Sequence, residues 1–355
     1  MRDFTGFTRG INLGGWLSQC DETTKEYFDT FITGQDLEQI AAMGFDHVRL
    51  PVDYMIIENE AGEPLEDGYR YMDACVSWAG ENGLHVLIDL HKTFGYSFDP
   101  LDTQMDREVF FHDAKLQERF YRLWERIAAR YAVESAKGMV AFELLNEIVS
   151  PEVVQDWNRI ADEAICRIRR ITPEAYVVVG GVRYNNVTSV PLLNPPADAH
   201  IVYNFHCYEP LVFTHQKAYW VENMPADRTV HYPEKMQSYR DMAVDLPAEL
   251  VQSLASENTA GLITAGPQLF EALFAPAVEM AERYDGVLYC GEYGVIDQAP
   301  AEDALRWYAD INAVFEKYGI GRAMWTYRRK DFGLTDAHYD GAREELVRLL
   351  ARGRR

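Results

Sequence analysis

The chain is poor in positive charge. Its 355 residues include 34 Lys and Arg but 56 Asp and Glu, so the formal net charge is −22 at pH 7. Nucleic acids and anionic membranes bind proteins through basic surfaces, and this composition therefore argues against both as partners. A polyanionic substrate is disfavoured for the same reason, whereas a neutral polymer is not.

Cysteine motifs and long apolar runs are also missing. The five cysteines are widely spaced, odd in number and form no Cys-x-x-Cys pair, which argues against a zinc ribbon or a full disulfide framework and favours reduced thiols.

No apolar run approaches the roughly 18 residues that a membrane span needs. The opening MRDFTG lacks the apolar segment of a secretory signal, so we expect a cytoplasmic protein, or a secreted one if a signal has been removed. Nothing in the sequence indicates a protein partner.

Short apolar runs alternate with longer segments of helical spacing. The runs at 85–90, 176–181 and 200–206 are almost continuously apolar, which is typical of parallel strands buried on both faces. Glycine, proline, asparagine or aspartate lies near every run. The predicted strands are 8–13, 46–51, 85–90, 139–145, 176–181, 200–206, 287–291 and 321–326.

The segments between these runs are predicted to be helices. In 112–131, apolar residues recur at three- and four-residue spacing with charges between them. Other segments carry helix end signals, such as Gly44 after one segment and a serine followed by a proline at the start of another. The predicted helices are 35–43, 68–82, 112–131, 151–171 and 300–318.

Eight strand–helix units without a linker predict a single domain over 1–355, folded as a closed (β/α)8 TIM barrel. An open doubly wound sheet is the alternative, but no Gly-x-Gly-x-x-Gly follows the first strand, which weakens its dinucleotide-binding form. One connection, about 208–266, is too long for a simple loop and contains several aromatic residues and a helix or two at 234–256. We expect it to be an inserted subdomain after strand 6 that shapes the substrate site.

Two glutamates stand at predicted strand ends. Glu147 follows the run at 139–145, and Glu292 follows the run at 286–291. The carboxyl ends of all strands in a parallel barrel open on one face, so we expect the two side chains to face each other there. Two facing carboxyl groups can cleave a glycosidic bond, because one protonates the leaving oxygen while the other, about 5–5.5 Å away, attacks the anomeric carbon.

Polar or aromatic residues end the other predicted strands. Each has a structural explanation when taken alone, since a strand-end arginine is often a buried ion-pair partner and a lone histidine or tryptophan is more often part of the core. Core packing explains poorly why such residues end six different strands. In chain order they are Arg49, His91, Asn146 with Glu147, His206 with Tyr208, Glu292, and Trp325.

This ordered set resembles the active-site pattern of glycoside hydrolase family 5. The likeness extends over essentially the whole chain and is closest to the clostridial endoglucanases of the family that lack a signal peptide. It also includes a segment of the predicted insertion. The matching segments are 9–16 (RGINLGGW), 46–51 (DHVRLP), 141–147 (AFELLNE), 202–206 (VYNFH), 213–217 (FTHQK) and 289–295 (YCGEYGV).

The resemblance implies a retaining mechanism in which Glu147 is the acid/base and Glu292 is the nucleophile. The chemistry of the neighbouring residues agrees with these roles. Asn146 can hydrogen-bond the 2-hydroxyl of the sugar, and Arg49 near Glu292 would keep that carboxyl ionised. Tyr208 can position a carboxylate, and His91 and His206 can bind sugar hydroxyls or tune the acid/base. Trp325 offers a flat face to a pyranose ring, and Trp220 and Trp16 are further stacking candidates for which core packing is slightly favoured.

We therefore expect a retaining endo-β-glucanase that acts on β-1,4-glucan and also on mixed β-1,3/1,4-glucan, with no cofactor and no metal. A β-mannanase or an exo-acting β-glucosidase with the same site is the main alternative, because cleft shape and not the catalytic pair sets specificity. A sugar-binding barrel without turnover is a second alternative. A metal-dependent barrel hydrolase is a third, but it would need clustered ligands, and no His-x-His follows the first strand.

Overall fold

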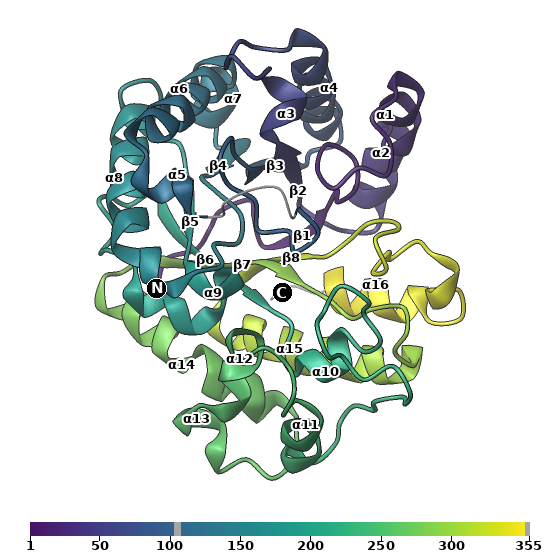
Figure 1. Cartoon of the computed structure of the whole chain (residues 1–355). Helices are drawn as coiled ribbons and strands as arrows, with labels where there is room; N and C mark the ends of the chain where they lie inside the picture. Colours follow the sequence, from purple (N-terminus) through teal and green to yellow (C-terminus); the bar gives the residue numbers. More distant parts are fainter. Residues whose placement is uncertain (103–107, 352–355) are drawn as a thin grey trace.

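A computed structural model describes residues 1–102 and 108–351 and forms a closed barrel of eight parallel strands (Figure 1). Each strand pairs with the next along the chain, and the first pairs with the last, which confirms the predicted (β/α)8 barrel. Positions 103–107 and 352–355, which the predicted domain 1–355 includes, lie outside the described residues. The strands are β1 (Arg9–Asn12), β2 (His47–Asp53), β3 (His85–Lys92), β4 (Val140–Glu143), β5 (Val177–Gly180), β6 (Ile201–Cys207), β7 (Val287–Tyr293) and β8 (Gly321–Met324).

The strands are apolar because helices cover the outside of the barrel and side chains fill its inside. Every residue of β2, β6 and β7 is buried. The predicted strands match the observed ones to within two residues at each end. One difference affects the site: the strand predicted at 139–145 ends at Glu143, so Glu147 lies in the loop beyond β4 and not at its end.

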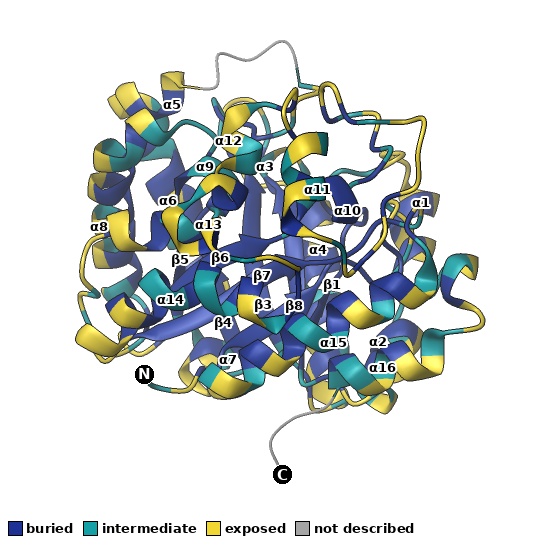
Figure 2. Cartoon of the chain, turned by 90° about the horizontal axis from the view of Figure 1, so that it is seen from below, coloured by how far each residue is buried: buried dark blue, intermediate teal, exposed yellow. Residues whose placement is uncertain are grey.

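Helices surround the barrel, with exposed residues on their outer sides (Figure 2). The predicted helices are all present, but the fifth strand is followed by a short left-handed turn, α9, and a 3-10 helix in place of a long helix. In the part of the chain that is described, no helix is long and apolar enough to cross a membrane. The helices are α1 (Lys25–Phe31), α2 (Gly34–Ala42), α3 (Tyr54–Ile57), α4 (Glu66–Glu81), α5 (Val109–His112), α6 (Ala114–Arg130), α7 (Ala132–Ala136), α8 (Val154–Arg169), α9 (Val182–Asn185), α10 (Leu211–Thr214), α11 (Met236–Met242), α12 (Ala248–Val251), α13 (Glu257–Ala260), α14 (Pro267–Arg283), α15 (Ala301–Tyr318) and α16 (Arg343–Ala351), with 3-10 helices η1 (Pro151–Val153), η2 (Val187–Leu192), η3 (Gln252–Ala255) and η4 (Ala337–Tyr339).

The inside of the barrel is apolar at one end and polar at the other. Phe4 and Phe7, which precede β1, pack on apolar side chains from the strands and plug the amino-terminal end. Toward the other end, the buried interior contains Arg49, Asp89 and Glu143. The apolar plug supports the barrel and leaves the polar layer beneath the face where the strands end, which is the functional face of this architecture.

The segment between β6 and α14 contains α10 to α13, which are drawn below the barrel in the view of Figure 1. It has its own buried side chains, including Met236 and Tyr239. Two side-chain contacts connect the middle of this segment to α15. His231 Nδ1 lies 2.7 Å from Asp303 Oδ2, and the hydroxyl of Tyr232 donates to Asp310 Oδ2 at 2.8 Å. The long connection expected at about 208–266 is thus a packed structure attached to the barrel.

Candidate active site

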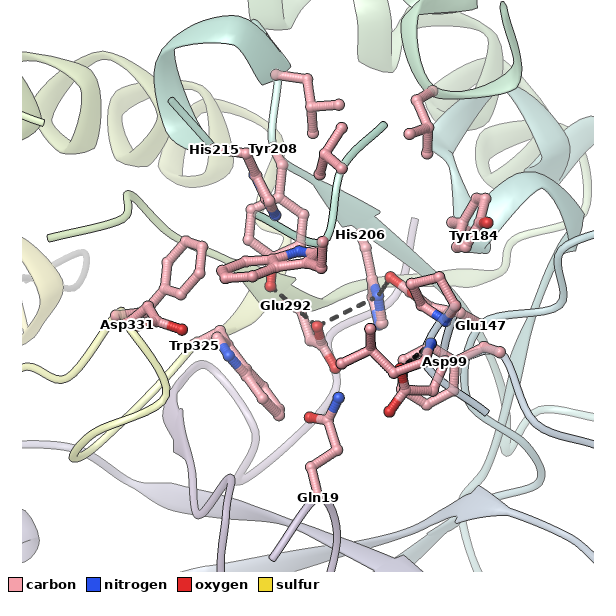
Figure 3. A pocket seen from close by; sticks show the side chains of 18 of the residues that line it. Gln19, Asp99, Glu147, Tyr184, His206, Tyr208, His215, Glu292, Trp325 and Asp331 are labelled. Atoms are coloured by element: carbon pink, nitrogen blue, oxygen red, sulfur yellow. Dashed lines mark hydrogen bonds and ion pairs between the residues drawn. The ribbon is translucent and has the colours of Figure 1, made fainter. Parts of the chain in front are cut away.

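Glu292 lies in β7 with its carboxyl group in the opening of the barrel (Figure 3). Arg49 of β2 donates from Nη1 to Oε1 at 2.7 Å, and the hydroxyl of Tyr208, just after β6, donates to Oε2 at 2.9 Å. Both interactions favour the ionised carboxylate. Burial raises the pKa of Glu292, while the charge of Arg49 and the hydrogen bond from Tyr208 oppose that rise. The arrangement suits a carboxylate that must stay ionised within a buried site.

Arg49 is fully buried at the centre of the polar layer. Its Nε and Nη2 atoms donate to the two oxygens of Glu143 at 2.7 and 2.8 Å, and Nη2 lies 3.0 Å from Asp89 Oδ2. Three carboxyl groups therefore surround one guanidinium, and burial raises the pKa of Asp89 to about 7. The predicted proximity of Arg49 to Glu292 is present, but with none of its side chain exposed, Arg49 contacts Glu292 from inside the barrel and does not line the cleft.

Glu147 lies across the opening from Glu292, beside His206 of β6. His206 Nδ1 is 2.8 Å from Glu147 Oε1. Burial raises the pKa of Glu147 well above its ordinary value, and the negative charge of Glu292 raises it further. Burial also lowers the pKa of His206 well below its ordinary value, so the imidazole is neutral at neutral pH. A carboxyl group whose pKa is raised, beside a neutral imidazole, is suited to general acid catalysis.

The two carboxyl groups are close enough to act on one bond. One oxygen of Glu147, one oxygen of Glu292 and Nδ1 of His206 all lie within 4.8 Å of one another. Retaining glycosidases separate their carboxyl groups by about 5–5.5 Å, and inverting ones by about 6.5–9.5 Å to leave room for a water molecule. The short separation fits direct attack by one carboxylate on the sugar.

The same three side chains are also spaced as possible metal ligands. However, both oxygens of Glu292 already accept hydrogen bonds from Arg49 and Tyr208. A guanidinium in contact with a carboxylate repels a second cation, so these residues fit an organic substrate better than a divalent ion. That the reaction needs neither metal nor cofactor stays a prediction.

His91 and Trp325 lie together at the side of the cleft. Their rings are parallel, with centroids 5.8 Å apart and an angle of 4° between the planes. Burial lowers the pKa of His91 to about 4, so this imidazole is also neutral. Asn146 is buried with its Nδ2 3.4 Å from His91 Nε2, and its Oδ1 accepts from Arg49 Nη2 at 2.8 Å. The structure thus brings His91 and Trp325 to the cleft and places Asn146 just beneath its surface.

The cleft over the two carboxyl groups has a volume of about 680 Å³. The insertion contributes Tyr219, Trp220 and Leu250 to its lining, and Tyr219 is 79% exposed. Trp16 is instead fully buried and donates from Nε1 to Phe28 O at 2.9 Å, so core packing is the correct interpretation for this residue. Acidic side chains outnumber basic ones in the lining: Asp21, Asp99, Glu147, Glu209, Glu222, Glu249, Glu292 and Asp331 against Arg183 and Lys330.

Sequence reasoning missed the polar residues inside the strands. Asn204 of β6 donates to Glu143 Oε1 at 2.7 Å and accepts from the backbone N–H of Gly291 at 2.8 Å, which fixes the strand just before Glu292. The sequence does contain a pattern that could have indicated them, because Glu143, Asp89 and Asn204 are single polar residues within apolar runs. A strand buried on both faces must pair such a group internally.

Comparisons with known proteins identify the relatives of this chain. Residues 8–331 match the family model described as cellulase (glycosyl hydrolase family 5). The chain is 44% identical to cellodextrinase A of Ruminococcus flavefaciens over 91% of this chain and 86% of that protein. It is 40% identical to endoglucanase C of Acetivibrio thermocellus over 98% of both. A solved structure of Thermotoga maritima Cel5A with cellobiose superposes with a TM-score of 0.74 at 23% identity, covering 98% of this chain and 100% of that one, and this likeness shows the fold.

The resemblance seen in the sequence is therefore confirmed by the family model and by relatives that span nearly the whole chain. Two facing carboxyl groups on the carboxyl-terminal face of a parallel barrel are an arrangement that can hydrolyse a glycosidic bond. The chain is a glycoside hydrolase and belongs to glycosyl hydrolase family 5.

Proposed function

We propose that this chain is a retaining endo-β-glucanase that hydrolyses β-1,4-glucan and mixed β-1,3/1,4-glucan, with Glu147 as the acid/base and Glu292 as the nucleophile. One observation carries the proposal: the two carboxyl groups face each other within 4.8 Å, one beside Arg49 and the other beside a neutral His206. Relatives named endoglucanase and cellodextrinase support a β-glucan as the substrate.

In the first step, an oxygen of Glu292 attacks the anomeric carbon, and the bond between that carbon and the leaving oxygen breaks. Glu147 gives its proton to the leaving oxygen, so the departing sugar leaves as an alcohol. The products of this step are a glycosyl ester of Glu292 and an ionised Glu147. Tyr208 and Arg49, which contact the oxygens of Glu292, stabilise its charge before the attack.

In the second step, Glu147 takes a proton from water, and the water oxygen attacks the same carbon and displaces Glu292. Glu292 carries no charge while it is an ester, so the Coulombic contribution that raises the pKa of Glu147 is absent. The pKa of Glu147 therefore falls between the two steps, and the same group changes from acid to base. Two inversions at one carbon retain the β configuration.

The segment 208–266 acts in this proposal as an inserted wall of one catalytic domain over 1–355. Its residues Tyr219, Trp220 and Leu250 line the cleft, beside the substrate contacts proposed for His91, His206 and Trp325. A cleft lined by aromatic residues of the insertion as well as by the carboxyl pair suits an extended chain of glucosyl units. A β-mannanase or an exo-acting β-glucosidase could use the same carboxyl pair, and a sugar-binding barrel would bind without turnover.

A hydrolysis panel tests the substrate. Barley β-glucan, lichenan, mannan and xyloglucan are incubated with the protein, with a chelator in parallel, and the products are separated by length. We expect short oligosaccharides from the two glucans and no effect of the chelator. Mannan hydrolysis alone, glucose as the sole early product, or binding without turnover would each replace the proposal with one of its alternatives.

Two experiments test the mechanism. Proton NMR of the first products should show the β-anomer, and an initial α-anomer would overturn the retaining assignment. Glu147→Ala should reduce turnover of natural glucan by about 10²–10⁴-fold, yet spare the first step for aryl glycosides whose leaving groups need no proton. Azide should then restore the second step by replacing the activated water. Equal losses on both substrates without rescue would remove Glu147 from the acid/base role.

A further inference from the structure

Glu147, the residue proposed as acid/base, lies outside the strands of the barrel. β4 ends at Glu143, and Glu147 follows in a segment without regular structure. Backbone hydrogen bonds flank Glu147 on both sides: Asn146 N–H donates to Leu90 O at 3.0 Å, and Tyr184 N–H donates to Ile148 O at 2.9 Å. A proton donor must sit at hydrogen-bond distance from the leaving oxygen, so the position of this loop matters for the chemistry.

Tyr96 reaches this loop from the segment after β3. Its hydroxyl donates to the backbone carbonyl of Glu147 at 2.8 Å and accepts from the backbone N–H of Val149 at 2.9 Å. The side chain is 1% exposed, and its ring packs edge-on against Phe111 with centroids 5.2 Å apart. One hydroxyl thus bridges two main-chain groups of the loop, one of them on Glu147 itself.

The base of Tyr96 is tied to the strand that carries another site residue. Tyr96 N–H donates to Thr93 O at 2.9 Å, and Thr93 directly follows Lys92, the last residue of β3. His91, beside the cleft, is the residue before Lys92. Tyr96 therefore gives the loop after β4 a second connection to β3, in addition to the hydrogen bond between Asn146 N–H and Leu90 O.

We propose that Tyr96 is a positioning residue that keeps Glu147 at the position from which its carboxyl group can protonate the leaving oxygen. This inference rests on the acid/base role proposed above for Glu147. Tyr96 acts through the main chain of Glu147 and leaves the carboxyl free to meet the substrate. Loss of the bridge lets the loop shift, and a displacement of about 1 Å in a reacting group can cost about 10²-fold in rate.

Proton donation is the step that should respond. A sugar leaving group needs the proton during bond cleavage, whereas 2,4-dinitrophenolate leaves without one. Tyr96→Phe removes only the hydroxyl and keeps the ring against Phe111. We expect kcat/KM for cellotetraose to fall about 10–100-fold, while kcat/KM for 2,4-dinitrophenyl β-cellobioside stays within about threefold of the wild-type value. kcat/KM is the right quantity because it reports the first step alone.

Tyr239→Phe is the matched control. Tyr239 is equally buried, and its hydroxyl donates to a backbone carbonyl, that of His231, at 2.7 Å in the insertion. This variant should lose one buried hydrogen bond from a tyrosine hydroxyl to a backbone carbonyl, and some stability with it, without any dependence on the leaving group. Melting curves for both variants set an assay temperature at which each is folded.

A second replacement keeps the test decisive if Tyr96→Phe folds poorly. p-Aminophenylalanine at position 96 retains an N–H donor for the Glu147 carbonyl and a weak acceptor for Val149. We expect it to give an intermediate loss with the same dependence on the leaving group. Rates equal to wild type in both replacements, or equal losses on both substrates, would overturn the inference.

Glu147→Ala, measured beside these variants, separates the two possible failures. If Glu147→Ala shows the leaving-group dependence and Tyr96→Phe does not, only the role of Tyr96 is wrong. If Glu147→Ala itself lacks that dependence, the proposed function fails first. A further readout is the basic limb of the pH profile on cellotetraose. A loosened loop exposes the Glu147 carboxyl, so this limb should move to lower pH in Tyr96→Phe.

Discussion

Arg49 and Glu143 form a fully buried ion pair, and the same guanidinium contacts Glu292. Two hydrogen bonds join them, from Nε to Oε2 at 2.7 Å and from Nη2 to Oε1 at 2.8 Å. Removal of one partner from a buried pair costs more than the pair contributes, because a desolvated charge is left without its counterpart. The pair therefore links the stability of the barrel to the geometry of the site.

Glu143→Ala should lower the free energy of unfolding by about 3–5 kcal/mol, as is typical when one member of a buried ion pair is deleted. Glu143→Gln keeps an acceptor for Arg49, so its free energy of unfolding should fall by a smaller amount. Chemical denaturation followed by fluorescence measures both. The exposed pair Lys25–Asp29 on α1 provides the control, and Asp29→Asn should leave the midpoint almost unchanged. Wild-type stability in Glu143→Ala would show that Asp89 and Glu292 compensate for the loss.

Glu292→Gln should reduce glucan hydrolysis by more than about 10³-fold while the melting curve stays close to that of the wild type. The amide still fills the space beside Arg49 and Tyr208, but it is a far weaker nucleophile. A 2-deoxy-2-fluoro cellobioside with a good leaving group should form a slow covalent adduct with the wild-type protein. Peptide mass spectrometry should locate that adduct at Glu292, and an adduct on another residue would disprove the assignment.

Tyr208→Phe should move the acidic limb of the pH profile to higher pH. The hydroxyl of Tyr208 donates to Glu292 at 2.9 Å and stabilises the ionised form. Its loss raises the pKa of Glu292, so the nucleophile becomes protonated at a pH where the wild type is still active. A hydrogen bond to a charged group contributes about 1.5–3 kcal/mol, which corresponds to about one to two pH units. Measurement of kcat/KM against pH with an aryl cellobioside tests the shift, and an unmoved acidic limb would contradict it.

The barrel can be predicted from the sequence because each strand is marked by a short pattern of neighbouring residues. Continuous apolar runs mark strands covered on both faces, and the strand ends follow from the polar residue after each run. Glu292 and His206 lie within the strands they were assigned to, and Tyr208 directly follows β6. The parallel arrangement then brings these ends to one face without further information.

The rest of the site depends on contacts that no local pattern encodes. Asp89, Glu143 and Asn204 come from three strands, and their pairing with Arg49 and with one another depends on how the closed barrel sets their register. Tyr184 lines the cleft because residues 183–185 take left-handed backbone angles, with φ between 54° and 58°. Non-glycine residues adopt such angles only where the surrounding structure imposes them, so a sequence pattern does not reveal them.

The acidic cleft should select neutral glucans. With more carboxylates than basic groups in its lining, the cleft repels the charged groups of carboxymethyl cellulose. We expect kcat/KM on barley β-glucan to exceed that on carboxymethyl cellulose by more than about tenfold at low salt, with the gap narrowing as salt screens the repulsion.

A double variant on the insertion tests this charge effect. Glu222 and Glu249 line the cleft and are exposed, so their replacement by Gln should improve hydrolysis of carboxymethyl cellulose about two- to fivefold and leave barley β-glucan unchanged. The same double change at the exposed Glu279 and Glu282 on α14 keeps the net charge matched but lies outside the cleft lining. Equal gains from both double variants would assign the effect to net charge and not to the cleft.

Trp220 should determine how strongly long chains bind. It is partly buried and lines the cleft from the insertion, with the ring of Tyr219 edge-on at a centroid distance of 4.9 Å. If a glucosyl unit beyond the cleaved one stacks there, its binding energy can orient the unit that is cleaved. Trp220→Ala should therefore reduce kcat/KM for cellohexaose about tenfold and that for a short aryl cellobioside much less.

The competing explanation is that Trp220 only packs the insertion. In that case the variant would melt at a lower temperature and lose activity equally on every substrate. Trp78→Ala is the matched control, because Trp78 is a partly buried tryptophan on α4 that stacks on Trp16. Its loss should reduce stability without any dependence on chain length. A ladder of cello-oligosaccharides assayed for both variants separates the two cases, and a length-independent loss in Trp220→Ala would make this residue part of the packing alone.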